Sequence, residues 1–299
     1  MNRIALHLEG RRMVTAPRIK GSSWLPQPGL GEGASMVATN RRFFRLGAVA
    51  AIVGSLLAGV GNVLHPGTPV ANGLGVARVI SGSTIWTPVH LLIIAGLILM
   101  LGGLVAISQS IQGGLAGALA RFGQAAAIAG MTVGMVLVMV DGVAAKQLAD
   151  AWGVAPPEER AAALRVLLAE ETVNFALAAL FNILLAGVTY VLLGLAVAYG
   201  RAYPRWLGWV AVAGAAGSLA AGTLEALAGQ STAITKVSTI ITPTVLTLWT
   251  AVIGVLLYRR ATSLASASAA ELDEVSPKAL KPTNGAPPAP TLQASRRSR

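Results

Sequence analysis

The hydrophobic residues of this chain fall into separate runs of about twenty positions, and short polar segments that carry most of the charges divide them. The runs cover residues 44–64, 86–108, 122–140, 172–198, 206–227 and 238–258. A helix needs about twenty apolar residues to cross roughly 30 Å of hydrocarbon. The pattern therefore predicts an all-α fold, a polytopic bundle of six transmembrane helices, which we number as spans one to six.

The two ends of the chain have a different composition. Residues 1–42 are basic, rich in Gly, Pro and Ser, and without a helical period, while 261–299 form a Ser/Ala/Pro-rich tail. Such segments bury too little apolar surface to fold, so we expect both to be disordered and 43–260 to form the transmembrane domain. Met36 stands just before the charged flank of span one, which makes it a second candidate for the start of translation.

The connection between spans three and four, residues 142–170, is the longest between neighbouring spans. Pro156, Pro157 and the acids that follow are typical of a helix start, because proline and negative charge both suit the first helical turn. We expect an amphipathic helix here that lies at the membrane interface or leads into span four. On this interpretation Glu170 faces solvent.

Composition supports the membrane assignment and gives the protein an orientation. Hydrophobic residues make up 54% of the chain, charged residues only 12%, and the mean hydropathy is +0.66. The net charge of +11 comes mainly from the tails and two short connections, which hold eighteen of the 23 Lys and Arg residues. Basic segments stay on the cytoplasmic side, so both termini are predicted to be cytoplasmic, and the charge indicates contact with the lipid bilayer rather than nucleic acid.

A short turn adds a family resemblance. Pro204-Arg205-Trp206-Leu207-Gly208 stands at the start of span five and resembles a Pro-Arg-Trp-Leu-Gly turn found in uncharacterised bacterial six-span integral membrane proteins. The resemblance covers about ten residues and the six-span layout. It implies a bacterial inner-membrane protein, and it brings no activity and no catalytic residues with it.

Candidate chemistry gathers at the predicted extracytoplasmic ends of the spans. Ionisable groups in hydrocarbon are costly and normally face the bundle interior or water. The ionisable residues near these ends of the spans, together with the amide Asn174, are the site candidates: His65, His90, Asp141, Glu171, Asn174 and Glu225. Asn182 continues the face of Glu171 and Asn174 toward the membrane centre. We expect these side chains to line a polar pocket that binds a ligand.

Structural explanations exist for the same residues. A histidine beside a proline at a helix end is often a cap, Asp141 can simply close span three, and Trp86 is expected to be an interfacial anchor. His65, His90 and Glu171 are candidate ligands for Zn²⁺, Mn²⁺ or iron, but the chain has no H-E-x-x-H motif. Haem ligation by the two histidines is a further alternative, although haem ligands usually lie deeper within facing helices.

The sequence leaves three functions open. The first is the binding or transport of a small molecule through the polar pocket. The second is a membrane-embedded enzyme that depends on a metal or haem and uses His65 and His90, with Glu171, Glu225 or Asp141, as metal ligands or acid/base groups, although the sequence does not identify which residues are catalytic. The third is an accessory subunit, in an oligomer or with another membrane protein, whose polar cluster is only structural. The absence of cysteine excludes thiolate metal sites and cysteine nucleophiles.

Overall fold

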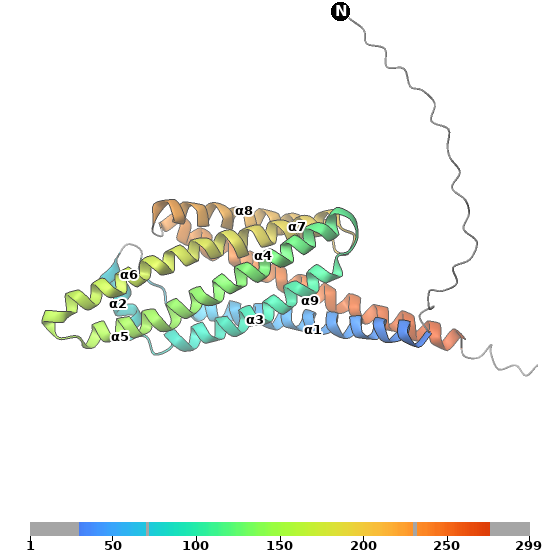
Figure 1. Ribbon diagram of the computed structural model, residues 1–299, viewed down its shortest axis with the longest axis horizontal. Helices are drawn as coiled ribbons and strands as arrows, with labels where there is room; N and C mark the ends of the chain where they lie inside the picture. The colour runs from blue at the N-terminus through green and yellow to red at the C-terminus, as the bar shows by residue number, and fades with distance from the viewer. Residues whose placement is uncertain (1–29, 70–71, 230–231, 276–299) are drawn as a thin grey trace, which may run out of the picture. The chain divides into compact units, whose positions relative to one another are not determined.

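The computed structural model describes residues 30–69, 72–229 and 232–275. The chain divides into two units, residues 1–39 and 40–299, and the description below concerns the second. Its elements, with the helix that enters it from the first unit, are α1 (Leu30–Leu64), α2 (Gly73–Gly82), α3 (Trp86–Ser110), α4 (Gly114–Met139), η1 (Val140–Ala145), α5 (Lys146–Val154), α6 (Pro157–Phe181), η2 (Asn182–Thr189), α7 (Tyr190–Tyr199), α8 (Arg205–Ala228) and α9 (Ala233–Val275) (Figure 1).

The predicted fold class is confirmed. The described residues are mainly helical and contain no strand, and six of the helical stretches are long and apolar enough to cross a membrane. Two elements, η1 and η2, are π-helical turns, which are wider than α-helical ones because each N–H bonds to the carbonyl five residues earlier. Each interrupts a longer helix at a polar residue.

The predicted helix in the connection between spans three and four is confirmed, since it starts at Pro157 and leads into span four, but the connection as a whole is more helical than expected. Helix runs without a break from Gly114 to Val154 and again from Pro157 to Tyr199, so only two residues of the predicted connection are non-helical. The break has a local cause: Pro156 is extended, and Pro157 opens α6 as its first residue, where a missing N–H costs nothing. At 1.5 Å per residue these helices are about 60 Å long, roughly twice the hydrocarbon thickness.

The predicted disorder at the two ends is wrong where the structure describes it. Helix α1 begins at Leu30, before the expected boundary, and α9 continues to Val275 instead of ending near 258. The rest of both predicted tails lies outside the described residues. The connection between spans one and two also contains a helix that was not predicted, α2.

Small residues bring the helices close together. A Cβ on Gly54 of α1 would lie 2.5 Å from the backbone nitrogen of Met100 on α3, and a Cβ on Gly208 of α8 would lie 2.5 Å from that of Ala198 on α7. These distances leave no room for a side chain, so the backbones themselves are in contact. Such contacts are the usual means of helix association in lipid, where no hydrophobic effect drives it.

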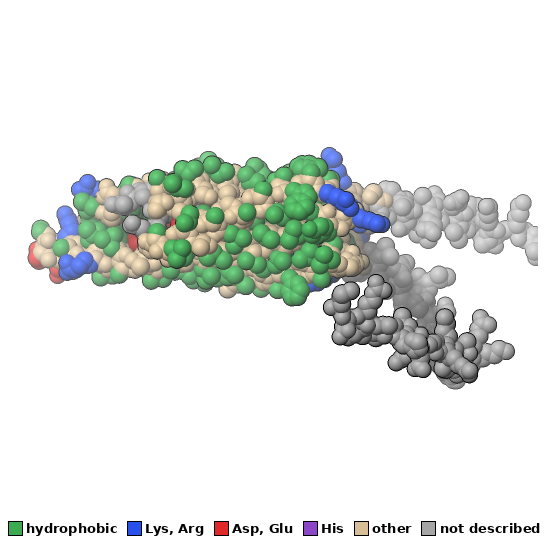
Figure 2. Space-filling model, turned by 90° about the horizontal axis from the view of Figure 1, so that it is seen from above, with side chains coloured by type: hydrophobic (Ala, Val, Ile, Leu, Met, Phe, Trp, Pro, Cys, Tyr) green, Lys and Arg blue, Asp and Glu red, His purple; other side chains and the backbone are tan. Residues whose placement is uncertain are grey.

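A small hydrophobic cluster stabilises one end of the bundle. It joins α2, the first residue of α3, η1, α5 and α6 at the left of Figure 1. Its buried members are Val76, Ala77, Ile80, Trp86, Ala145, Ala149, Trp152 and Leu167. In the face that Figure 2 shows, hydrophobic side chains cover the middle of the bundle and Lys and Arg lie toward its ends. The small cluster fixes η1 beside the start of α3.

Candidate functional site

Three of the predicted site residues meet at this end of the bundle. His65 directly follows α1, His90 lies in the second turn of α3, and Asp141 lies in η1. The Nε2 atoms of the two histidines are 3.3 Å apart, and the Oδ2 of Asp141 is 3.1 Å from His90 Nε2 and 3.8 Å from His65 Nε2. Among the described residues, these three side chains are close enough together to hold a metal ion.

Trp86 and Thr87 hold this cluster in place from the first turn of α3. The indole Nε1 of Trp86 donates to the Asp141 carbonyl (2.8 Å), and the Thr87 hydroxyl donates to the Gly142 carbonyl (2.7 Å). The Trp86 ring also contacts both imidazoles, with centroids 4.8 Å and 5.1 Å away. Trp86 is only 1% exposed, so the expectation of an interfacial anchor is wrong.

The wide turn of η1 allows Asp141 to reach the histidines. Gly142 packs directly against His90, and a Cβ at this position would lie 2.3 Å from His90 Cβ. The turn and the ring can therefore be this close only because residue 142 has no side chain. Single π turns inside α-helices are frequently found at functional sites.

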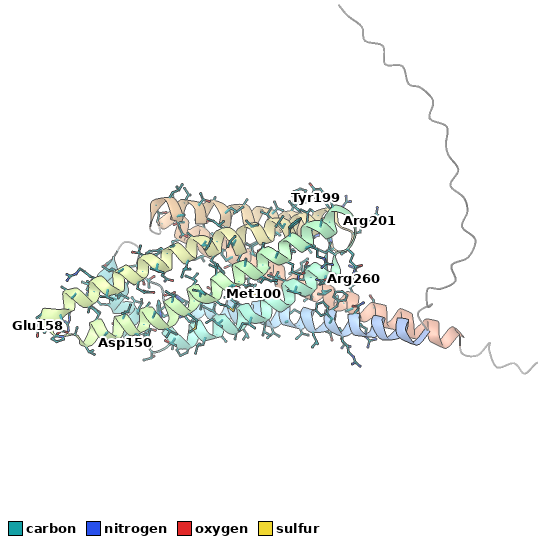
Figure 3. All side chains as sticks on the ribbon, in the orientation of Figure 1. Met100, Asp150, Glu158, Tyr199, Arg201 and Arg260 are labelled. Carbon is teal, nitrogen blue, oxygen red and sulfur yellow. The ribbon has the colours of Figure 1, made fainter. Side chains whose placement is uncertain are left out.

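A cavity of about 660 Å³ begins at this cluster, and all six candidate residues line it. On α3 the lining residues are Trp86, His90, Ile93, Leu97 and Met100, a spacing that keeps one helical face toward the cavity. The ten helical steps from His90 to Met100 correspond to about 15 Å along the axis of α3. Figure 3 shows Met100 between the two ends of the bundle, so the cavity extends from the polar cluster toward the middle of the helices.

Apart from the His65 cluster, a pair of polar residues lies in the same cavity wall. Asn182, the first residue of η2, donates from Nδ2 to Glu225 Oε2 at 3.3 Å, and both side chains are buried. Lys236 of α9 also lines the cavity and donates to the carbonyl of Thr68. Lys236 could not be placed beside the other candidates from the sequence, because it stands in the predicted connection between spans five and six.

Other carboxylates and amides are placed differently from the prediction. Glu171 lines the cavity, but among the described residues it does not belong to the group of potential metal ligands. Glu170 was expected to face solvent, yet both of its carboxylate oxygens are enclosed and have no hydrogen-bond partner among the described residues. The Oδ1 atom of Asn174 is likewise enclosed and unpartnered.

These features define a class of protein: a multi-pass membrane protein whose helices surround a cavity with a polar cluster at one end and walls that are mainly apolar but include the Asn182–Glu225 pair. Comparisons of the chain with protein-family models, with curated proteins and with solved structures gave no match.

Proposed function

We propose that this protein binds a small, elongated molecule inside the membrane, with the apolar part of the ligand in the cavity and its polar end at the His65 cluster. The cavity volume of about 660 Å³ carries this proposal. Ligand sites usually enclose about 300–1,000 Å³ and combine apolar walls with a few polar groups. The lining residues of α3 from His90 to Met100 extend over about 15 Å, which favours an elongated ligand.

The polar groups indicate what the ligand presents to them. The carboxylates of Asp141, Glu171 and Glu225 line the cavity, and Asn174 offers an enclosed oxygen that has no partner among the described residues. Ionised carboxylates and amide oxygens accept hydrogen bonds and do not donate them. A ligand with an amine, amide or hydroxyl group at one end complements this arrangement.

The proposal includes an orientation in the bacterial inner membrane. With both termini cytoplasmic, the polar end of the cavity faces the extracytoplasmic side. The eighteen-to-five division of Lys and Arg between the two predicted sides supports this orientation, because basic segments resist translocation. The Pro204–Gly208 turn supports the bacterial assignment through its resemblance alone.

Native mass spectrometry of the detergent-purified protein tests for a bound molecule. We expect a non-covalent adduct of small-molecule mass that survives removal of the detergent. Ala178→Phe places a ring in the cavity wall and should abolish the adduct, whereas Ala129→Phe, at an exposed position on α4, should retain it. Absence of any adduct, or equal adducts in both variants, would contradict ligand binding and favour the accessory-subunit interpretation.

A further inference from the structure

We propose that His65, His90 and Asp141 bind one Zn²⁺ ion, with an open coordination position toward the cavity. Two imidazoles and one carboxylate are a donor set that zinc accepts in sites with three protein ligands. This inference does not rest on the proposed ligand, since a metal can be measured whether or not a small molecule is bound.

The separations of the three donor atoms suit a metal at their centre. Zinc binds imidazole nitrogen and carboxylate oxygen at about 2.0–2.2 Å, so neighbouring ligands in a tetrahedral site are about 3.3–3.6 Å apart. The observed separations of 3.3, 3.1 and 3.8 Å bracket this range. A circle through three points at these distances has a radius of about 2.0 Å, so one position satisfies all three bond lengths without moving a donor.

The hydrogen bonds around His90 leave its Nε2 as an acceptor. His90 Nδ1 lies 2.7 Å from the Trp86 carbonyl, which can only accept, so the Nδ1 proton points there. In the neutral ring Nε2 then carries a lone pair, and it lies 3.1 Å from Asp141 Oδ2, which also only accepts. Two acceptors in contact require a cation or a shared proton between them. A metal ion meets this need for His65 as well.

The surroundings supply the outer support that metal ligands usually have. The Trp86 carbonyl fixes the orientation of the His90 ring, as a backbone acceptor commonly does for a metal-bound imidazole. The Trp86 indole and the Thr87 hydroxyl hold the carbonyls of the turn that carries Asp141. Within the described part of the chain three protein donors converge, and all three residues line the cavity, so a fourth position is open to water or a ligand.

Metal analysis of protein purified without a polyhistidine tag tests the site. We expect about one Zn²⁺ per chain after reconstitution with Zn²⁺ alone, a rise in thermal stability on adding Zn²⁺, and visible ligand-field absorption after exchange to Co²⁺. His65→Gln, His90→Gln and Asp141→Asn should each weaken Zn²⁺ binding by more than about tenfold, because even loss of an outer-shell partner costs 10–100-fold.

The chain offers a matched control for each kind of substitution. His7→Gln changes the third histidine of the sequence, and Asp150→Asn changes an exposed aspartate on α5, so both should leave Zn²⁺ binding intact. His65 is half-buried at a helix end, so its variant should fold even if the buried His90 variant does not. The proposal is overturned if the wild-type protein binds no Zn²⁺, or if His65→Gln and Asp141→Asn bind it as tightly as the controls. A protein that binds zinc but shows no small-molecule adduct would contradict only the proposed function.

Discussion

Gly142→Ala is the smallest change that should disturb the cluster without touching a polar atom. The new methyl group would lie 2.3 Å from His90 Cβ and 2.6 Å from its Cγ, where ordinary van der Waals contact begins at 3.4 Å. The turn and α3 must therefore separate by about 1 Å, or the histidine must move. The ring cannot turn away freely, because its Nδ1 is bonded to the Trp86 carbonyl.

The loss of stability in Gly142→Ala can be assessed by comparison with a substitution at a glycine that has space around it. Gly102 lies on α3, and a Cβ there would have its nearest neighbour, the Ala50 methyl, at 3.8 Å. Both substitutions gain about 1 kcal/mol of helix propensity, and this term cancels between the two variants. The remaining difference is the overpacking at His90, which is about 1–3 kcal/mol. We expect Gly102→Ala to match or exceed the wild type and Gly142→Ala to fall below it.

Thermal unfolding in detergent, followed by tryptophan fluorescence, measures the difference. For a chain of this size about 1 kcal/mol corresponds to roughly 2–4 °C in Tm, so the two variants should differ by several degrees. Equal Tm values for Gly142→Ala and Gly102→Ala would show that the turn does not pack against His90 as the structure has it. The reasoning about η1 would then be wrong.

Three further predictions concern other parts of the bundle. Since the chain has no cysteine, Glu158→Cys should react with a membrane-impermeant maleimide in intact cells and Ser298→Cys only after permeabilisation; the reverse pattern would refute the proposed orientation. Burial raises the pKa of the Tyr203 phenol, so its contribution to stability is complete below the ordinary value of about 10 and is lost as the pH rises through the higher folded pKa. Tyr203→Phe should reduce that alkaline loss in a pH series of Tm values, and an unchanged series would contradict it. Tyr190→Phe removes a hydroxyl bonded to Thr250 at 2.7 Å and should cost about 1 kcal/mol, whereas exposed Tyr199→Phe should cost nothing measurable in the same assay.

The sequence was sufficient for the architecture because hydrophobic runs of twenty residues have few alternatives to a spanning helix. It also placed six polar residues at one level, and the structure puts all of them in one cavity wall. The depth of each residue in the membrane could be assigned from the number of residues between it and the end of its hydrophobic run. The connection at 142–170 was harder, because a polar segment can be a loop or a helix that continues beyond the membrane.

The arrangement of the cluster could not be predicted from local pattern. Nothing in Val140–Ala145 distinguishes a π turn from an α turn, since the donors that hold its carbonyls come from Trp86 and Thr87, more than fifty residues away. For the same reason Glu171 stands third among the metal candidates predicted from the sequence, while Asp141 is predicted as a lining residue of the pocket with a helix end as its structural alternative. The aromatic residue that orients His90 was assigned to the lipid interface because tryptophan is so often found there.

The π turn at Val140–Ala145 also sets the rotational phase of everything that follows it in the same helix. Each residue of an α-helix advances the side chains by about 100°, so an inserted residue turns the next segment by that angle relative to an unbroken helix. Ala149 and Trp152 are buried in the small cluster with this phase. Deleting one residue from the turn would rotate both away from their partners while also withdrawing Asp141. The packing of the small cluster and the position of Asp141 therefore both depend on the number of residues in this turn. An insertion or deletion here would change both together.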